Sequence, residues 1–132
     1  MNKKYVITGA TFICLGIILG AFGAHALKKS LGFDEINSFE VGVRYQIYHG
    51  FALVVMGLAA NIIELNNKYF NGFLFGTILF SCSIYALVLD AILKLDFSFI
   101  GPITPVGGAI LIATWFYFIF KTVDSPLFYL AS

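Results

Sequence analysis

Charged side chains are scarce in this chain. Its 132 residues include only 8 Lys+Arg and 7 Asp+Glu, with a formal net charge of +1, whereas 60% of the residues are hydrophobic and 17% are aromatic. So little charge of either sign provides no basic face for nucleic acid and no acidic tail, and we expect no nucleic-acid partner. A composition this apolar is typical of an integral membrane protein.

Cysteine and proline are also rare, at 2 and 3 residues respectively. Cys14 and Cys82 both lie inside apolar runs, which excludes a disulfide framework and a paired-cysteine metal spacing. We expect both thiols to be buried and unreactive. Since no Pro/Ser-rich linker interrupts the chain, we predict a single domain over residues 1–132.

The apolar residues are grouped into runs that are long enough to cross a membrane. A helix rises about 1.5 Å per residue and must cover a hydrocarbon core about 30 Å thick. We predict spans at about residues 5–27, 46–64, 70–93 and 104–120. The fold class is therefore all-α, an integral membrane four-helix bundle with both termini on the same side. The first run exceeds a signal-peptide core, so we expect it to remain as a span.

The ends of two helices can be predicted from their capping residues. Asp34 is placed to cap a second helix that runs from about Glu35 to about Leu65. Thr104 is placed to cap the fourth helix, with Pro105 in its first turn. The lysines and the arginine are divided almost equally between the two sides of the membrane, so the positive-inside rule favours cytoplasmic termini only slightly.

Small residues supply the surfaces on which such helices can pack. Gly16 and Gly20 are four apart on the first span, and Gly72 and Gly76 are four apart on the third. Lipid tails are as apolar as leucine, so helices in a membrane associate by close packing rather than by hydrophobicity. We interpret both glycine pairs as packing surfaces.

Polar side chains at membrane depth gather at the end of the bundle opposite the termini. They are His25, Tyr45, Gln46, His49, Tyr85, Asp90 and Thr104. On the second helix the histidine face should point inward, because Glu40 and Arg44 lie on nearly the opposite side. Arg44 is a candidate contact for a lipid head group. Ionisable groups at this depth suggest function, although Asp90 can also pair with Lys94, four residues on.

The start of the fourth helix is a further candidate. Gly107 and Gly108 allow close approach to the helix start, where exposed amides attract anions. The alternative is a capped turn whose glycines pack against the first span.

Two histidines on neighbouring helices raise the possibility of haem or, with Asp90, of a metal. Neither has a supporting spacing motif, and no catalytic motif is present. We therefore expect no cofactor, no metal and no catalytic residue.

Four blocks of this sequence resemble the signatures of one known family. They are residues 20–27 (GAFGAHAL), 45–53 (YQIYHGFAL), 80–85 (FSCSIY) and 103–108 (ITPVGG) with Trp115 following. The chain resembles the bacterial membrane proteins of the YgdD and YwdK kind, called domain of unknown function 423 or uncharacterised protein family 0382. The resemblance implies a small four-span protein of the bacterial cytoplasmic membrane, and it implies no activity.

The favoured hypothesis is a non-enzymatic membrane protein that binds a lipid, a small ligand or a partner protein. Its candidate pocket comprises His25, Tyr45, Gln46, His49, Tyr85, Thr104, Gly107 and Gly108. The alternatives are an oligomeric transporter or channel, for which the glycine surfaces would supply contacts, and a haem or metal redox protein. Expected partners are membrane lipids and a second copy of the chain or another membrane protein.

Overall fold

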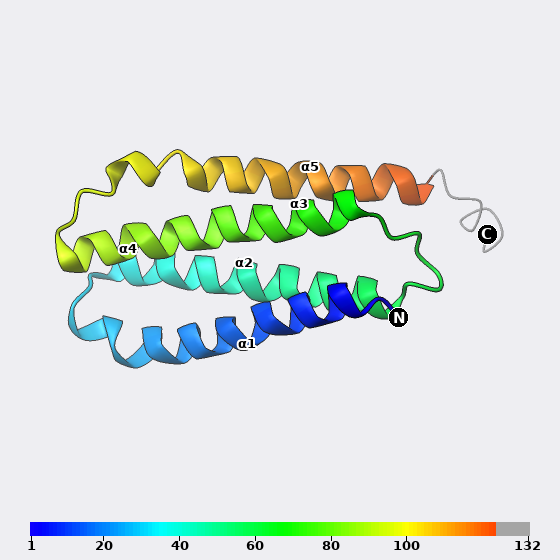
Figure 1. Cartoon of the computed structure of the whole chain (residues 1–132). Helices are drawn as coiled ribbons and strands as arrows, with labels where there is room; N and C mark the ends of the chain where they lie inside the picture. Colours follow the sequence, from blue (N-terminus) through cyan, green and yellow to red (C-terminus); the bar gives the residue numbers. More distant parts are fainter. Residues whose placement is uncertain (124–132) are drawn as a thin grey trace.

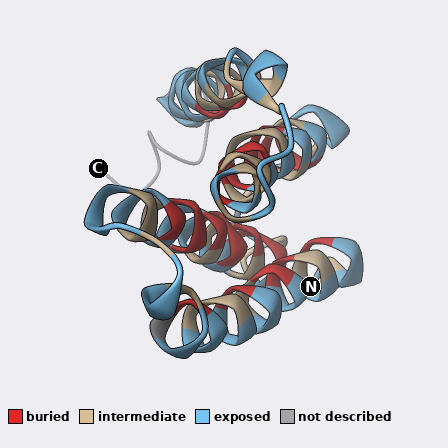
Figure 2. Ribbon diagram, turned by 90° about the vertical axis from the view of Figure 1, so that its left-hand side faces the viewer, coloured by how far each residue is buried: buried red, intermediate tan, exposed pale blue. Residues whose placement is uncertain are grey.

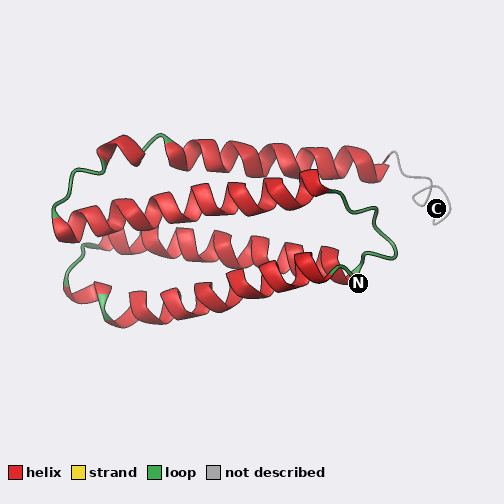
Figure 3. Ribbon diagram, viewed as in Figure 1, coloured by secondary structure: helices red, strands yellow, loops and turns green. Residues whose placement is uncertain are grey.

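The computed structural model describes residues 1–123, with the exception of the side chain of Ala24, as four long antiparallel helices (Figures 1 and 3). The first two are α1 (Lys3–His25) and α2 (Phe33–Leu58). The third is continuous and consists of α3 (Asn67–Thr77), a π-helical segment η2 (Ile78–Cys82) and α4 (Ser83–Leu93). The fourth is α5 (Ile103–Val123), and short 3-10 turns η1 (Leu27–Lys29) and η3 (Ser98–Ile100) lie in the connections. All secondary structure in this part of the chain is helical, in agreement with the predicted class.

The helices are arranged in sequence order rather than around one common axis. α1 packs chiefly on α2, α2 packs also on η2 and α4, and α5 packs chiefly on α3 and η2. Figure 2 shows that the buried residues line the contacts between neighbouring helices, whereas the outer faces of α1 and α5 are exposed. The start of α1 and the end of α5 lie at the same end of the molecule (Figure 1).

The contact between α1 and α2 depends on two glycines that face each other. A Cβ added to Gly9 would lie 2.5 Å from the Gly50 carbonyl oxygen, and one added to Gly50 would lie 2.9 Å from the Gly9 carbonyl oxygen. The two backbones therefore touch at this crossing. Three of the four glycines predicted to pack closely are confirmed: Gly16 lies against Ile47 of α2, and Gly72 and Gly76 lie against α5. Gly20 makes only an ordinary contact with Val43 of α2.

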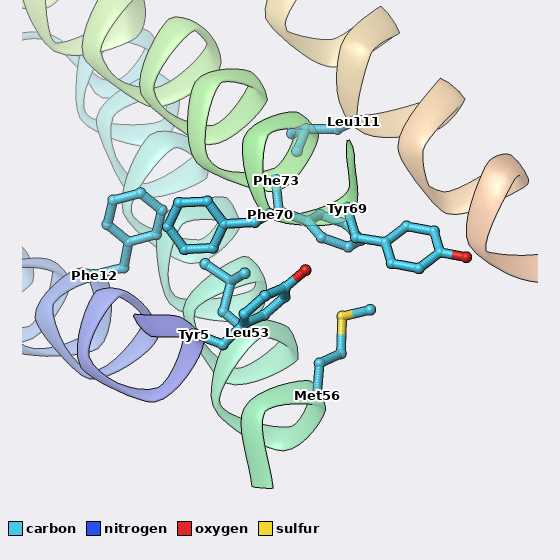
Figure 4. Packing of buried hydrophobic residues seen from close by; sticks show 8 residues of the cluster. All are labelled: Tyr5, Phe12, Leu53, Met56, Tyr69, Phe70, Phe73 and Leu111. Carbon is cyan, nitrogen blue, oxygen red and sulfur yellow. The ribbon is translucent and has the colours of Figure 1, made fainter. Parts of the chain in front are cut away.

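The apolar core fills the half of the bundle that contains the N-terminus. Side chains from all four helices converge there: Tyr5, Phe12, Leu53, Met56, Tyr69, Phe70, Phe73 and Leu111 (Figure 4). Tyr5 also donates a hydrogen bond from its hydroxyl to the Asn66 carbonyl (2.6 Å), which ties α1 to the turn before α3. The opposite half contains a smaller apolar cluster of Phe39, Val43, Ile84 and Val88.

Three helical stretches among the described residues are long and apolar enough to cross a membrane. They are Lys3–Lys29, Asn67–Leu93 and Ser98–Val123. α2 is not among them; its first half carries Asp34, Glu35, Glu40 and Arg44, and its middle carries Gln46 and His49. Four spans were predicted; the structure contains all four long helices, and three of them have the apolar composition of a span.

The predicted end of the second helix is wrong. α2 stops at Leu58 rather than near Leu65, and residues 59–62 form turns. The Gly57 carbonyl accepts a hydrogen bond from the Asn2 amide (2.7 Å), so the chain start takes an acceptor that a longer helix would use itself. Asn66 then caps α3 by accepting from the Tyr69 amide (3.0 Å).

Both predicted caps are also wrong. Gly32 occupies the N-cap of α2, and Asp34 lies in the first turn. α5 begins at Ile103, so Thr104 is inside the helix and its hydroxyl turns to another helix, whereas Pro105 does lie in the first turn.

The expectation of buried thiols is wrong as well, because Cys14 and Cys82 are both exposed. Both side chains are on the outside of the bundle, where they would contact lipid rather than the protein core that the sequence suggested.

Two glycines on the same helix face provide a test of the α1–α2 contact. Gly9→Ala should destabilise the protein by about 1–3 kcal/mol, because the new methyl group meets backbone that cannot move without separating the helices. Gly20→Ala is the matched control, since its Cβ would lie 3.6 Å from Val43, an ordinary contact. The measurement is the midpoint of unfolding in a mild detergent, and equal midpoints for both variants would contradict the proposed contact.

Candidate functional site

The histidine face of α2 points into the protein, as predicted. Gln46 and His49 are each 6% exposed, whereas Glu40, Arg44 and Tyr48 on the other face are exposed. Burying the amide and the imidazole requires partners, because an unpaired polar group in a membrane interior is costly.

Gln46 finds its partners on the helices at both sides of α2. Its Nε2 donates to the Phe12 carbonyl of α1 (2.9 Å), and its Oε1 accepts from the Tyr85 hydroxyl of α4 (2.9 Å). Two residues of the predicted pocket are thereby joined. Both polar atoms of the Gln46 side chain thus have partners within the protein, and the residue connects three helices.

His49 is also fully paired. Nδ1 lies 2.8 Å from the Tyr45 carbonyl, which can only accept, and Nε2 lies 3.2 Å from Trp115 Nε1, which can only donate. The ring is therefore neutral with its proton on Nδ1. Tyr45 itself is 43% exposed and stacks on His49 at 6.1 Å between ring centroids.

His25 does not join this group. Its side chain is exposed at the end of α1, in a shallow hollow lined otherwise by Ala21, Phe22 and Ala26. The two imidazoles are therefore not brought together, and His49 has both nitrogens engaged. Residues 1–123 contain no group of three or more His, Cys, Asp and Glu side chains able to hold a metal ion.

Asp90 is half-buried on α4, and its Oδ1 has no hydrogen-bond partner among the described residues. Its backbone carbonyl accepts from the Lys94 amide, which closes the helix, and Lys94 has a left-handed conformation with φ 52°.

The start of α5 is closed by packing. A Cβ on Gly107 would collide with the Phe80 amide nitrogen, and one on Gly108 would lie 3.6 Å from the Phe80 ring. The Thr104 hydroxyl lies 2.7 Å from the Ser83 hydroxyl, which in turn donates to the Phe80 carbonyl. The two glycines thus pack on α3–α4, not on α1 as the sequence alternative supposed.

Phe80 contacts three of the predicted pocket residues, Tyr45, Gly107 and Gly108. It belongs to η2, where the wider π-helical turn brings its backbone to Gly107 and its ring to Tyr45, at 4.8 Å between centroids. The adjacent Ser81 donates its hydroxyl to the Gly42 carbonyl of α2 (2.8 Å). Single-turn π segments are frequent at functional sites. The family resemblance included this stretch as the block FSCSIY, but nothing in that block indicated a π turn.

A groove opens beside Phe80 at the end of the bundle opposite the N-terminus. Its volume is about 650 Å³, within the range of about 300–1,000 Å³ that ligand sites occupy. The first turns of α2 form its mouth, α4 forms its floor, and the start of α5 closes one side. It is lined by Asp34, Glu35, Asn37, Ser38, Val41, Phe80, Ile84, Leu87, Val88, Gly101 and Thr104.

Of the eight predicted pocket residues, only Thr104 lines this groove. The lining residues of α2 were missed, although positions 34, 38 and 41 have the spacing of one helix face. Their acidic and polar character suggested only a segment at the head-group level. The residues of α4 were missed because an apolar floor cannot be distinguished from a packing face by sequence.

Comparison with known proteins identifies the family. The model of a family described as "Protein of unknown function (DUF423)" matches residues 19–108. The chain belongs to the DUF423 family. The matched region includes every residue of the predicted pocket, and the resemblance seen in the sequence is thus confirmed.

Relatives of this DUF423 protein carry names that agree with the apolar helices. UPF0382 membrane proteins of Staphylococcus haemolyticus and Staphylococcus aureus are each 36% identical over 121 residues, which are 91% of this chain and 95% of each relative. A UPF0382 membrane protein of Staphylococcus saprophyticus is 34% identical over 121 residues, 91% of this chain and 97% of the relative. No solved structure matches. The chain is a membrane protein of a family without an assigned activity.

The bond between Gln46 and Tyr85 can be tested by a double-mutant cycle. Tyr85→Phe should destabilise the protein by about 1–2 kcal/mol, because it leaves Gln46 Oε1 unpaired in an apolar interior. The same change in a Gln46→Met background should have a smaller effect, since the acceptor is already gone.

The control for this cycle is Tyr48→Phe, on the exposed face of α2, which should leave stability unchanged. Unfolding midpoints in detergent provide the readout. Additive effects of Tyr85→Phe and Gln46→Met would contradict the bond.

Proposed function

We propose that this DUF423 protein crosses the membrane four times and binds an amphiphile, a lipid or a small ligand, in the groove beside Phe80. The observation that carries the proposal is the groove itself: about 650 Å³, polar at its mouth and apolar at its floor. Such a gradient matches a molecule with a polar head and an apolar body. The role is binding rather than catalysis, with membrane lipids as the expected partners.

The position of α2 supports the fourth span. α2 lies between α1 and the continuous helix α3–α4, and both of these are long and apolar enough to cross a membrane. Its 26 residues correspond to about 39 Å of helix, more than a hydrocarbon core of about 30 Å requires. On this proposal the charged first turns extend to the head groups, and the mouth of the groove lies at the membrane surface.

The groove and the N-terminus lie at opposite ends of the bundle. The distribution of lysines slightly favours cytoplasmic termini, and in that orientation the mouth of the groove is on the outer side of the membrane. A second copy of the chain or a membrane protein partner is compatible with the exposed outer faces of α1 and α5.

Single cysteines at the two ends of the bundle test the topology. Asn37→Cys at the mouth of the groove should react with an impermeant maleimide added to intact cells, whereas Asn67→Cys at the start of α3 should react only after the cells are opened. The parent chain measures any background from Cys14 and Cys82. Labelling of both positions from the same side would contradict four spans.

Retention of a ligand tests the site. Protein extracted gently from its membrane should carry a bound amphiphile in native mass spectrometry, and Leu87→Trp should remove it by filling the floor of the groove. Ser38→Trp is a second obstruction at the mouth, where the native side chain is exposed and the core is undisturbed. The matched control is Leu93→Trp, an exposed position on α4 outside the groove. A folded wild-type protein without any bound amphiphile would overturn the proposal.

A further inference from the structure

The charges of the groove are of one sign. Asp34 and Glu35 both line it, and they are joined at the mouth by the polar side chains of Asn37 and Ser38. No lysine, arginine or histidine is among its lining residues. The groove therefore presents carboxylate and amide oxygens to whatever enters it, which disfavours the anion that the start of α5 suggested.

The position of these two carboxylates at the start of α2 stabilises part of their negative charge. Carboxylates near a helix N-terminus interact favourably with its macrodipole, by about 0.3–1 kcal/mol each. Asp34 and Glu35 are both in that first turn, and the Glu35 carboxylate lies beside Gly32. The helix end carries only about half an elementary charge, however, so most of the negative charge stays available at the mouth.

The apolar floor continues inward from that acidic mouth. Val41 of α2, Phe80 of η2 and Ile84, Leu87 and Val88 of α4 line it. From Phe80 to Val88 the helix rises about 12 Å, which carries the floor well below the head-group level. Ile84 and Val88 are 8% and 4% exposed and belong to the apolar cluster of this half of the bundle.

We infer that the groove selects a bilayer lipid whose head group carries a primary amine, with the ammonium held at Asp34 and Glu35 and an acyl chain on the apolar floor. The inference rests on the proposed function and adds the class of ligand to it. An ammonium donates hydrogen bonds to carboxylates and carries the opposite charge, whereas a head group that is only anionic meets two like charges. Charge complementarity thus selects the lipid head group, and apolar contact with the floor binds the acyl chain.

Lipid selection in a defined membrane tests this inference. We would reconstitute the full chain in nanodiscs of equal parts phosphatidylethanolamine and phosphatidylglycerol, extract it gently, and measure the bound lipids by native mass spectrometry. Bound phosphatidylethanolamine should exceed phosphatidylglycerol by about fivefold, the effect expected from exposed ion pairs at the mouth. The combined change Asp34→Asn and Glu35→Gln should return the ratio to that of the membrane, with lipid still bound.

Glu40→Gln is the matched control, because Glu40 is an acid of the same helix that does not line the groove. It should leave the lipid ratio at its wild-type value, and circular dichroism would establish that all variants have the same helix content. Lipid that is bound by the wild type, lost in Leu87→Trp and unselective for head group would overturn this inference while the proposed function stands. A wild type that binds no lipid would overturn both.

Discussion

Direct contact between helix backbones is the constraint on which the rest of this structure depends. In a membrane, burying apolar side chains between helices gains little over leaving them in lipid, so association requires surfaces that approach closely. Gly9 and Gly50 supply such a surface between α1 and α2, and Gly107 supplies another where α5 meets the backbone at Phe80. Each contact sets the distance between two helices and thereby the positions of the polar side chains that link them.

The second of these contacts also shapes the groove. The π-helical segment η2 presents its backbone to Gly107, and in the same turn Ser81 donates a hydrogen bond to the Gly42 carbonyl. η2 is therefore attached to α5 on one side and to α2 on the other. Phe80 is held between them and lines the groove. The cavity is thus a consequence of how three helices are joined at one turn.

The buried polar groups have a structural part in this arrangement. Gln46 connects α1, α2 and α4, and His49 joins α2 to Trp115 of α5. Such paired groups specify one packing over others, because any shift of a helix would leave a polar atom unpaired in an apolar interior. Asp34, Asn37 and Ser38, which line the groove, are exposed instead.

The sequence by itself determined the class of fold, the order of the helices, the packing glycines Gly16, Gly72 and Gly76, and the inward face of α2, because these follow from local composition and from periods of three and four residues. It also marked the end of the bundle where the groove lies. Only the tertiary structure decided that Gln46 and His49 are satisfied internally, that His25 stays apart, and that Phe80 and the acidic first turn of α2 line one cavity. Pairing between distant residues depends on the distances and rotations of whole helices. The π turn at residues 78–82 adds to the rotation of the helix that carries Tyr85, and no short-range pattern in the sequence encodes it.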